Sequence, residues 1–292
     1  MGLCFNVLGS GSRGNATIVS DGATHILVDA GLSGKETARR LGEFGLDPGK
    51  VSAIVITHEH PDHCMGVNPL VKKWGIPLYM TQRAFEEASG RKTPLIRIDA
   101  AMHRAISPGE GFAVGGIEVT CFSVPHYAGR PPHDAGRSPH DAGRSLRNPA
   151  VEPLGFVFEK DGVKIGIAID LGFVTNLVAE RLKGCAGLVL ESNHDVRMLQ
   201  AGPYPWEIKQ YILSRGGHLS NDQAAHFLAN EFDGAAAHVV LAHLSEKCNH
   251  PDIALTTAET ALEERRGMAG MGCRTTKCAV ARPDRIGETY RY

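Results

Sequence analysis

The stretch THEHPDHCMG at residues 57–66 constrains the fold and the chemistry of this chain more than any other part of it. It follows the apolar run VSAIVI, which is typical of a buried strand. Because side chains alternate along a strand, His58 and His60 point to the same side and can bind one metal ion. Pro61 ends the extended segment and leaves Asp62 and His63 on the turn into the next helix, where they would bind a second ion. A solvated polar loop has no need of this spacing, so we predict a site for two metals.

Three more side chains of ligand type stand at the ends of apolar runs. Asp170 ends KIGIAID and could bridge two cations, with the cap of a following helix as the alternative. His243 follows HVVLA and is predicted to be a further ligand, unless it is a packed core histidine. Asp29 ends HILVD, where it would either accept a proton from a ligand histidine or serve as a turn residue in DAGLSG.

Short apolar runs separated by glycine-rich turns predict alternating strands and helices in both halves of the chain. The predicted strands are residues 3–8, 16–20, 25–29, 51–57, 77–80, a meander over 111–124, a hairpin over 154–170 that turns on Asp161-Gly162, and 238–242. The predicted helices are residues 33–44, 67–75, 82–88, 173–182, 205–214, 220–231 and 251–265.

This alternation predicts an α/β fold of four layers, an αββα sandwich in which two sheets pack face to face with helices outside. We expect a single domain over residues 1–265, with a loop insertion at 125–150 that contains a repeat. Residues 266–292 would form a C-terminal part with a strand near 277–281 and a loose basic tail.

Charge and composition narrow the class of protein. The chain has 31 Lys and Arg against 32 Asp and Glu, so a nucleic acid would have to be held by a local basic patch. Its seven cysteines form no CxxC pair and the first residues show no export signal, which predicts a reduced, cytoplasmic protein. No apolar run approaches the roughly 20 residues of a spanning helix, so no membrane role is expected.

The motif HEHPDH, with Asp29 before it and Asp170 and His243 after it, resembles the metallo-β-lactamase-fold hydrolases. The chain is most similar to their YycJ/WalJ branch, which has phrases like GSGSRGNAT, LVDAGLSG, ESNHDVRML and AHLSEKCN over roughly residues 3–260. The resemblance implies the αββα fold, two divalent metal ions and a 5′-to-3′ exonuclease activity on double-stranded DNA. Asp170 stands where the β-lactam-cleaving class has a cysteine, which argues against β-lactams as substrates.

Two metal ions roughly 3.5–4 Å apart would share a water, lower its pKa from about 16 toward neutrality and direct the hydroxide at phosphorus. Asp62 is predicted to orient that hydroxide as well as to bind metal. His194 and His218 are predicted to donate to the phosphate oxygens, with helix capping beside bystander histidines as the alternative. Five histidines and two aspartates suit zinc, and a mixed nitrogen and oxygen site also accepts manganese or iron.

Polar residues on loops near this site are candidates for binding substrate. The glycine-rich loop GSGSRGN has free backbone N–H groups that could hold a phosphate. The predicted substrate-binding residues are Ser10, Ser12, Asn15, Asn193 and Ser220.

The phrase PHDAGRS occurs at Pro132 and again at Pro139, after the related PHYAGRP at Pro125. The family resemblance implies one more ligand histidine after the strand IEVTCFSVP, and the repeat offers His126, His133 and His140. We predict His126, because a strand end holds a ligand more rigidly than a long loop rich in glycine and proline. His133 and His140 both keep the His-Asp-Ala that is usual in the related branch, and His140 is the second candidate because it lies nearest the downstream VEPLGF.

Other functions remain open at this stage. The near-neutral net charge of −1 also suits a phosphodiesterase that acts on small molecules, and the same metals would serve a nuclease directed at RNA. A binding protein that keeps the metals for structure is disfavoured, because structural zinc sites are closed tetrahedra.

Overall fold

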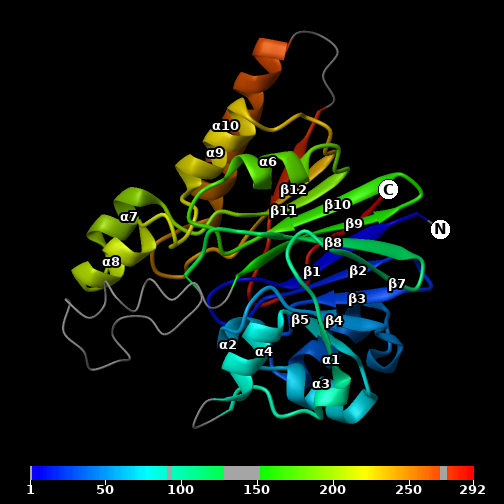
Figure 1. Ribbon diagram of the computed structural model, residues 1–292. Helices are drawn as coiled ribbons and strands as arrows, with labels where there is room; N and C mark the ends of the chain where they lie inside the picture. Colours follow the sequence, from blue (N-terminus) through cyan, green and yellow to red (C-terminus); the bar gives the residue numbers. More distant parts are fainter. Residues whose placement is uncertain (1, 91–93, 128–151, 270–274) are drawn as a thin grey trace.

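The computed structural model describes residues 2–90, 94–127, 152–269 and 275–292 and shows two β-sheets packed face to face (Figure 1). Each sheet has seven strands among these residues. The first has the order β14-β1-β2-β3-β4-β5-β6, formed by Thr289–Arg291, Cys4–Gly9, Ala16–Ser20, His25–Val28, Ala53–Val55, Leu78–Met80 and His103–Ala105. The second has the order β13-β12-β11-β10-β9-β8-β7, formed by Lys277–Val280, His238–Ala242, Gly187–Glu191, Val163–Ala168, Leu154–Lys160, Ile117–Ser123 and Gly111–Val114.

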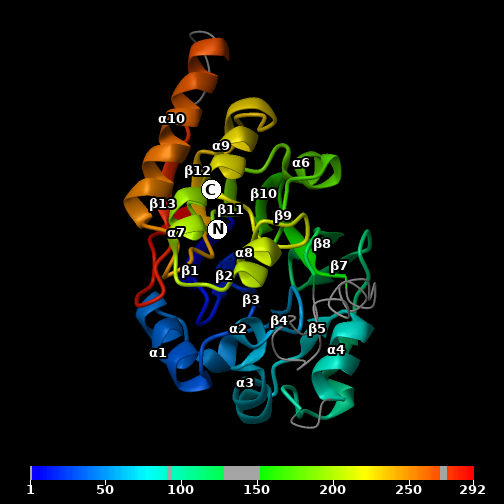
Figure 2. The same ribbon diagram turned by 90° about the vertical axis from the view of Figure 1, so that its left-hand side faces the viewer.

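Helices cover the outer face of each sheet, so the predicted αββα sandwich is confirmed (Figure 1). Those outside the first sheet are α1 (Gly34–Phe44), α3 (Val67–Trp74) and α4 (Gln82–Ser89). Those outside the second sheet are α6 (Asn176–Leu182), α9 (Asn221–Asn230) and α10 (Pro251–Ala269). Three short helices lie toward one end of the sandwich (Figure 2), namely α2 (Pro61–Cys64), α7 (Val196–Ala201) and α8 (Trp206–Ile212). Two 3₁₀ turns span Pro48–Lys50 and Ala100–Met102.

Three buried apolar clusters among the described residues hold these layers together. Phe5 of β1 and Phe156 and Phe158 of β9 belong to the cluster between the two sheets. A second cluster lies under α6, α9 and α10, and a third lies under α1, α3 and α4. Full burial of each such aromatic side chain contributes about 1.5–3 kcal/mol. No helix in the described ranges is both long and apolar enough to cross a membrane.

Strand direction decides where the functional side chains gather. β3 and β4 are parallel, and so are β10, β11 and β12. β8 runs with β10 because both are antiparallel to β9. Because the carboxyl ends of strands that run together meet at one edge of their sheet, the segments after these strands lie close to one another.

Three of the residues that follow these strands have a left-handed backbone. Asp29, Asp170 and His243 have φ values of 58°, 55° and 57°, a region that Asp and His adopt more readily than most residues. Such a conformation costs energy and persists where the surrounding structure holds it, most often at functional sites.

The C-terminal part differs from its prediction. The strand expected near 277–281 is present as β13. The prediction of a loose tail after it is wrong, because β14 pairs antiparallel with β1 and sets Arg291 opposite Cys4. The aromatic rings explain the difference, since Tyr290 and Tyr292 stack on Phe5 with centroids 5.0 and 6.4 Å away. β11 was also not among the predicted strands.

Candidate metal centre

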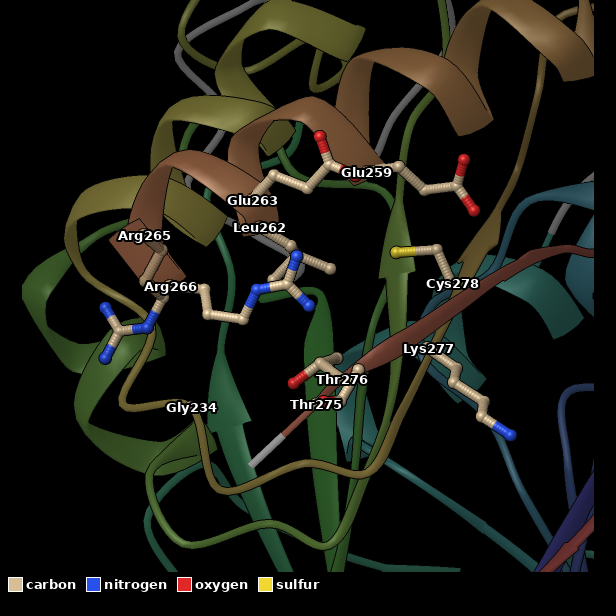
Figure 3. A pocket seen from close by; sticks show the side chains of 10 residues that line it. All are labelled: Gly234, Glu259, Leu262, Glu263, Arg265, Arg266, Thr275, Thr276, Lys277 and Cys278. Carbon is tan, nitrogen blue, oxygen red and sulfur yellow. The ribbon is translucent and has the colours of Figure 1, made fainter. Parts of the chain in front are cut away.

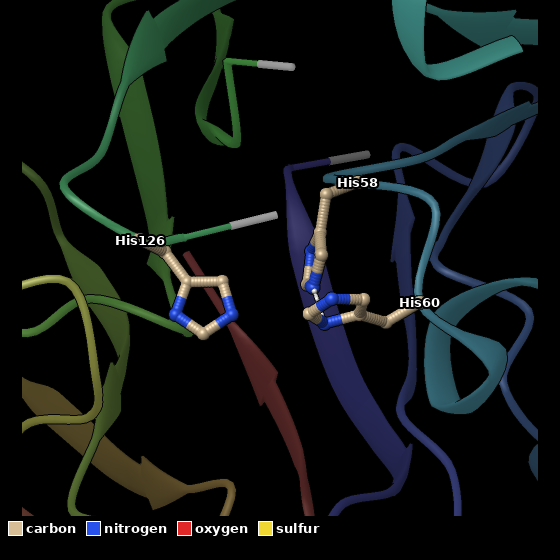
Figure 4. A group of neighbouring side chains, drawn as sticks. All are labelled: His58, His60 and His126. Atoms are coloured by element: carbon tan, nitrogen blue, oxygen red, sulfur yellow. Dashed lines mark hydrogen bonds between the residues drawn. The ribbon is translucent and has the colours of Figure 1, made fainter. Parts of the chain in front are cut away.

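The histidines of the HEHPDH motif lie where β4 ends, and His126 faces them from the segment after β8. His58 Nε2 and His60 Nδ1 are 2.8 Å apart. Together with His126 they offer three ring nitrogens that lie within 4.8 Å of one another (Figure 4). The structure therefore brings His126 to the motif, as predicted for a ligand. His133 and His140 lie outside the described residues.

A second group forms around the side chain of Asp62 in α2. Asp62 Oδ2 lies 3.3 Å from His63 Nε2 and 3.3 Å from His243 Nε2. Asp62 and His63 belong to α2, which follows β4 of the first sheet, and His243 follows β12 of the second sheet. Segments after strands of both sheets therefore contribute to the group. One carboxylate oxygen and two imidazole nitrogens at this separation can bind one divalent ion.

Asp170 lies between the two groups. Its Oδ2 is 2.9 Å from His63 Nε2, and its Oδ1 is 3.9 Å from His126 Nε2. The alternative role as a helix cap does not apply, because α6 begins at Asn176 and its cap is Thr175. Oδ1 of Asp170 also lies 3.3 Å from Nδ1 of His218 and 3.3 Å from Nδ1 of His243, so Asp170 contacts side chains of both groups.

Hydrogen bonds behind the ligand atoms fix the orientation of the imidazoles. His63 Nδ1 donates to Asp29 Oδ2 at 2.8 Å, which is the second-layer position predicted for Asp29. Thr57 donates to the same carboxylate from its backbone N–H and its hydroxyl. His126 Nδ1 donates to the Gly217 carbonyl at 2.9 Å. In His63 and in His126, the hydrogen bond at Nδ1 leaves Nε2 directed into the centre.

Glu191, at the end of β11, also accepts hydrogen bonds from histidines behind the metal centre. The sequence analysis did not identify this residue. It is fully buried, and its Oε1 accepts from His218 Nδ1 at 2.8 Å and His243 Nδ1 at 2.9 Å. Its Oε2 accepts from the backbone N–H groups of Leu171 and Leu219. Burial alone would raise the pKa of Glu191, but the two histidines lower it to about 2, so the carboxylate stays ionised.

The protonation states of His58 and His126 suit the binding of a cation. Burial lowers the pKa of His58 well below its usual range and that of His126 to about 3, so both rings are neutral. His126 Nε2 is buried and has no hydrogen-bond partner among the residues that the structure describes. A neutral, buried ring nitrogen without a partner is the donor that a bound metal ion needs.

His63 and His243 behave differently from His58 and His126. Burial would lower the pKa of His63, but the nearby carboxylates, foremost that of Asp29, raise it well above its usual range. The same balance raises the pKa of His243, with Asp170 as the largest opposing charge. Cations that bind here would have to displace these protons.

A cavity of about 500 Å³ opens onto this centre. Ser12, Asn193 and His218 line it together with the ligand-type residues. His194 is buried and does not line it, so the structure brings His218 but not His194 toward a substrate.

The other residues predicted to bind substrate form hydrogen bonds with backbone groups around the site. Ser10 Oγ accepts the His243 N–H at 2.8 Å and donates to Asn15 Oδ1. The Asn15 N–H donates to the Asp62 carbonyl at 2.8 Å. Ser220 caps α9 and forms a capping box with Gln223. This geometry favours a positioning role for Ser10 and Asn15 and a capping role for Ser220.

A second cavity of about 450 Å³ lies between α10 and β13 (Figure 3). Its lining mixes acidic and basic side chains, and it is formed by Gly234, Glu259, Leu262, Glu263, Arg265, Arg266, Thr275, Thr276, Lys277 and Cys278. None of the metal-binding groups found among the described residues includes these side chains. Among the described residues, the groups that could bind a metal therefore lie at the strand ends and not in this second cavity.

Comparison with known proteins agrees with this geometry. Residues 24–244 match the family described as beta-lactamase superfamily domain. The chain belongs to the beta-lactamase superfamily. This membership confirms the family resemblance that the motif HEHPDH indicated.

Relatives within the beta-lactamase superfamily carry nuclease names. Exodeoxyribonuclease YycJ of Bacillus anthracis is 35% identical over 268 residues, which cover 91% of each protein. Exodeoxyribonuclease WalJ of Streptococcus pneumoniae serotype 2 (strain D39 / NCTC 7466) is 32% identical over 257 residues, 88% of this chain and 87% of that protein. The metallo-beta-lactamase fold protein YhfI of Bacillus subtilis has a TM-score of 0.68 at 16% identity, with 100% of both chains covered, and so shares the fold.

Proposed function

We propose that this chain is a metal-dependent exodeoxyribonuclease that hydrolyses phosphodiester bonds at the ends of linear double-stranded DNA, in the 5′-to-3′ direction. The names of the two relatives support the reaction class. The observation that carries the proposal is the continuous cluster in which Asp170 joins two groups of ligand atoms.

In this proposal each group would hold one divalent ion. The first ion would be held by His58, His60 and His126 and the second by Asp62, His63 and His243, with Asp170 in contact with both groups. Two divalent cations at such a site supply a water of lowered pKa and neutralise charge on the phosphate. Zinc suits the histidine-rich set, and manganese or iron would also be accepted.

The protein side chains orient the reaction. Asp62 is the more exposed of the two aspartates, with 23% of its side chain accessible against 2% for Asp170, so it can contact both water and substrate. His218 lines the cavity, and although burial opposes its charge, Glu191 and Asp170 raise its pKa to about 9. A protonated His218 would donate a hydrogen bond to a phosphate oxygen, where charge develops.

Purified protein loaded with zinc or manganese tests the proposal on 5′-labelled and 3′-labelled linear duplex, single-stranded DNA, RNA and a chromogenic phosphodiester. We expect duplex to be degraded from the 5′ end, and EDTA or Asp62→Ala to abolish the cleavage. Asp284→Ala changes an exposed aspartate and should cleave as the wild type does. Robust cleavage by the EDTA-treated protein would reject the metal mechanism.

A phosphodiesterase of small molecules is the second candidate, because the net charge of −1 gives no global attraction to DNA. A salt titration separates the two. Binding through several phosphates weakens steeply as salt rises, whereas cleavage of a small ester barely responds. An RNA substrate would be revealed by preferential cleavage in the RNA arm of the same assay.

The proposed location is the cytoplasm, which rests on the cysteines. The six cysteines in the described ranges are all free thiols, and five of them are buried. Free thiols persist in a reducing compartment.

A further inference from the structure

Helix α8 turns apolar side chains toward the cavity of the metal centre and not toward the core. Ile208, Tyr211 and Ile212 of α8, with Tyr204 just before it, line that cavity. Their spacing of three and four residues places them on one side of the helix. None of the residues of α8 is buried, and none belongs to the three apolar clusters of the core. Figure 2 shows α8 in front of the strand ends.

The rest of the lining is mostly polar. It includes Asp62, Asp170, His60, His126, His218 and His243. The same space of about 500 Å³ can therefore hold a phosphate with its cations beside an apolar group. A ligand that fits both kinds of lining joins a phosphate ester to a flat apolar group, as a nucleotide does.

Two contacts involve the tyrosines among these side chains, and one of them places a positive charge beside the Tyr204 ring. The Tyr211 hydroxyl donates to the Tyr127 carbonyl at 3.2 Å. Lys247 places its Nζ 5.2 Å from the centre of the Tyr204 ring. Aromatic rings beside a cation are the features that bind single-stranded nucleic acids, because every base has a flat face on which a ring can stack.

We propose that the wall of Tyr204, Ile208, Tyr211 and Ile212 binds the base of the terminal nucleotide while its phosphate lies at the metal centre. This inference rests on the proposed nuclease function and adds a base-binding subsite to it. The base must leave its pair to enter the cavity, so the enzyme would act on the frayed end of a duplex.

The first test uses wild-type protein and two duplexes whose terminal 5′ nucleotide is unpaired in both, and this nucleotide is either normal or abasic. We expect the abasic end to raise KM by about fivefold to hundredfold, the range given by one base stacked on an aromatic side chain, with a smaller change in kcat. Equal KM values for the two ends would overturn the proposal.

The second test uses variants. Tyr204→Ala and Ile208→Ala should raise KM for the normal end and leave KM for the abasic end unchanged, so that the preference for a base disappears. Trp206→Ala and Leu213→Ala are matched controls, because these side chains are 61% and 42% exposed and do not line the cavity. Variants that keep the full preference would reject the wall as the subsite.

The two proposals fail in different ways. Protein that cleaves no DNA in any arm refutes the nuclease function itself. Protein that cleaves both ends equally well retains the nuclease function and refutes only the base-binding wall.

Discussion

Glu191 shows how one buried carboxylate can orient two histidines of a metal centre. It accepts hydrogen bonds from His218 and His243 through the same oxygen, while its other oxygen accepts two backbone N–H groups. A glutamine at this position has one oxygen and one NH₂ group. Because an NH₂ group cannot accept, either the pair of imidazoles or the pair of backbone groups loses its partner.

We therefore expect Glu191→Gln to weaken metal affinity by about 10–100-fold and to lower nuclease activity in parallel. Calorimetric titration of metal-free protein with zinc measures the affinity. Asp21→Asn is the matched control, since Asp21 is also a buried carboxylate but pairs with Lys160, away from the centre. An equal loss of metal affinity in both variants would show a general effect of destabilisation and not a role of Glu191.

The sequence reveals some residues of the centre and hides others for a physical reason. His58, His60, Asp62 and His63 are neighbours in the chain, so their spacing alone predicts a shared site. Glu191 ends the apolar run GLVLE in the same way that Asp29 ends HILVD, and that signal could have found it. Sequence does not show whether a polar side chain on a loop faces a cavity or the loop itself. The Asn15 side chain, predicted to bind substrate, accepts hydrogen bonds from the Ser10 hydroxyl and the Gly11 N–H of its own loop.

At the scale of elements, the position of helix α2 depends on a close approach of two backbones. A Cβ atom on Gly31 would lie 1.6 Å from the Asp62 carbonyl oxygen. Alanine at this position would push α2, and with it Asp62 and His63, away from the loop that follows β3. The cost comes from the lack of space for a Cβ atom beside Gly31 and not from its backbone dihedral angles.

We expect Gly31→Ala to destabilise the fold by about 1–3 kcal/mol, the usual cost of overpacking, and to weaken metal binding. Gly42→Ala is the control, because an added Cβ there meets nothing within 4 Å and Gly42 lies inside α1. Alanine in a helix interior should stabilise by about 0.5–1 kcal/mol. Urea denaturation measures both changes, and a Gly31→Ala protein as stable as the wild type would contradict the close contact.

Long periodic elements were easier to predict than short ones. The hairpin of β9 and β10 and the helices α1 and α9 follow from clear apolar patterns and caps. α7 has only six residues, and β11 is a short strand buried at every residue that offers no alternation of polar and apolar side chains. Only the packing against β10 and β12 defines β11 as a strand.

At the scale of the whole molecule, the two-sheet arrangement was predictable because each half alternates strands with helices. The pairing of the last strand of the chain with its first strand was not predictable. β13 and β14 follow one another in sequence but join different sheets, β13 beside β12 and β14 beside β1. The last residues therefore tie the second sheet back to the first strand of the chain, through contacts that no local pattern contains.

This closure makes the C-terminal strand a part of the core. Tyr290 is 9% exposed, belongs to the cluster between the sheets and stacks on Phe5. Removing residues 288–292 would expose that face of Phe5 and leave the edge of β1 without its partner. Since full burial of one large apolar side chain contributes about 1.5–3 kcal/mol, we expect the truncation to cost about 3 kcal/mol or more once the ladder is lost as well.

The truncated chain should unfold at a lower urea concentration, and Tyr290→Ala should reproduce a large part of the shift. Glu288→Ala removes an exposed side chain from the same segment and should leave the midpoint unchanged. The metal centre lies at the strand ends and takes no ligand from β14, so folded truncated protein should keep its zinc affinity. An unchanged midpoint after truncation would mean that β14 adds nothing to stability, as the loose tail predicted from sequence would.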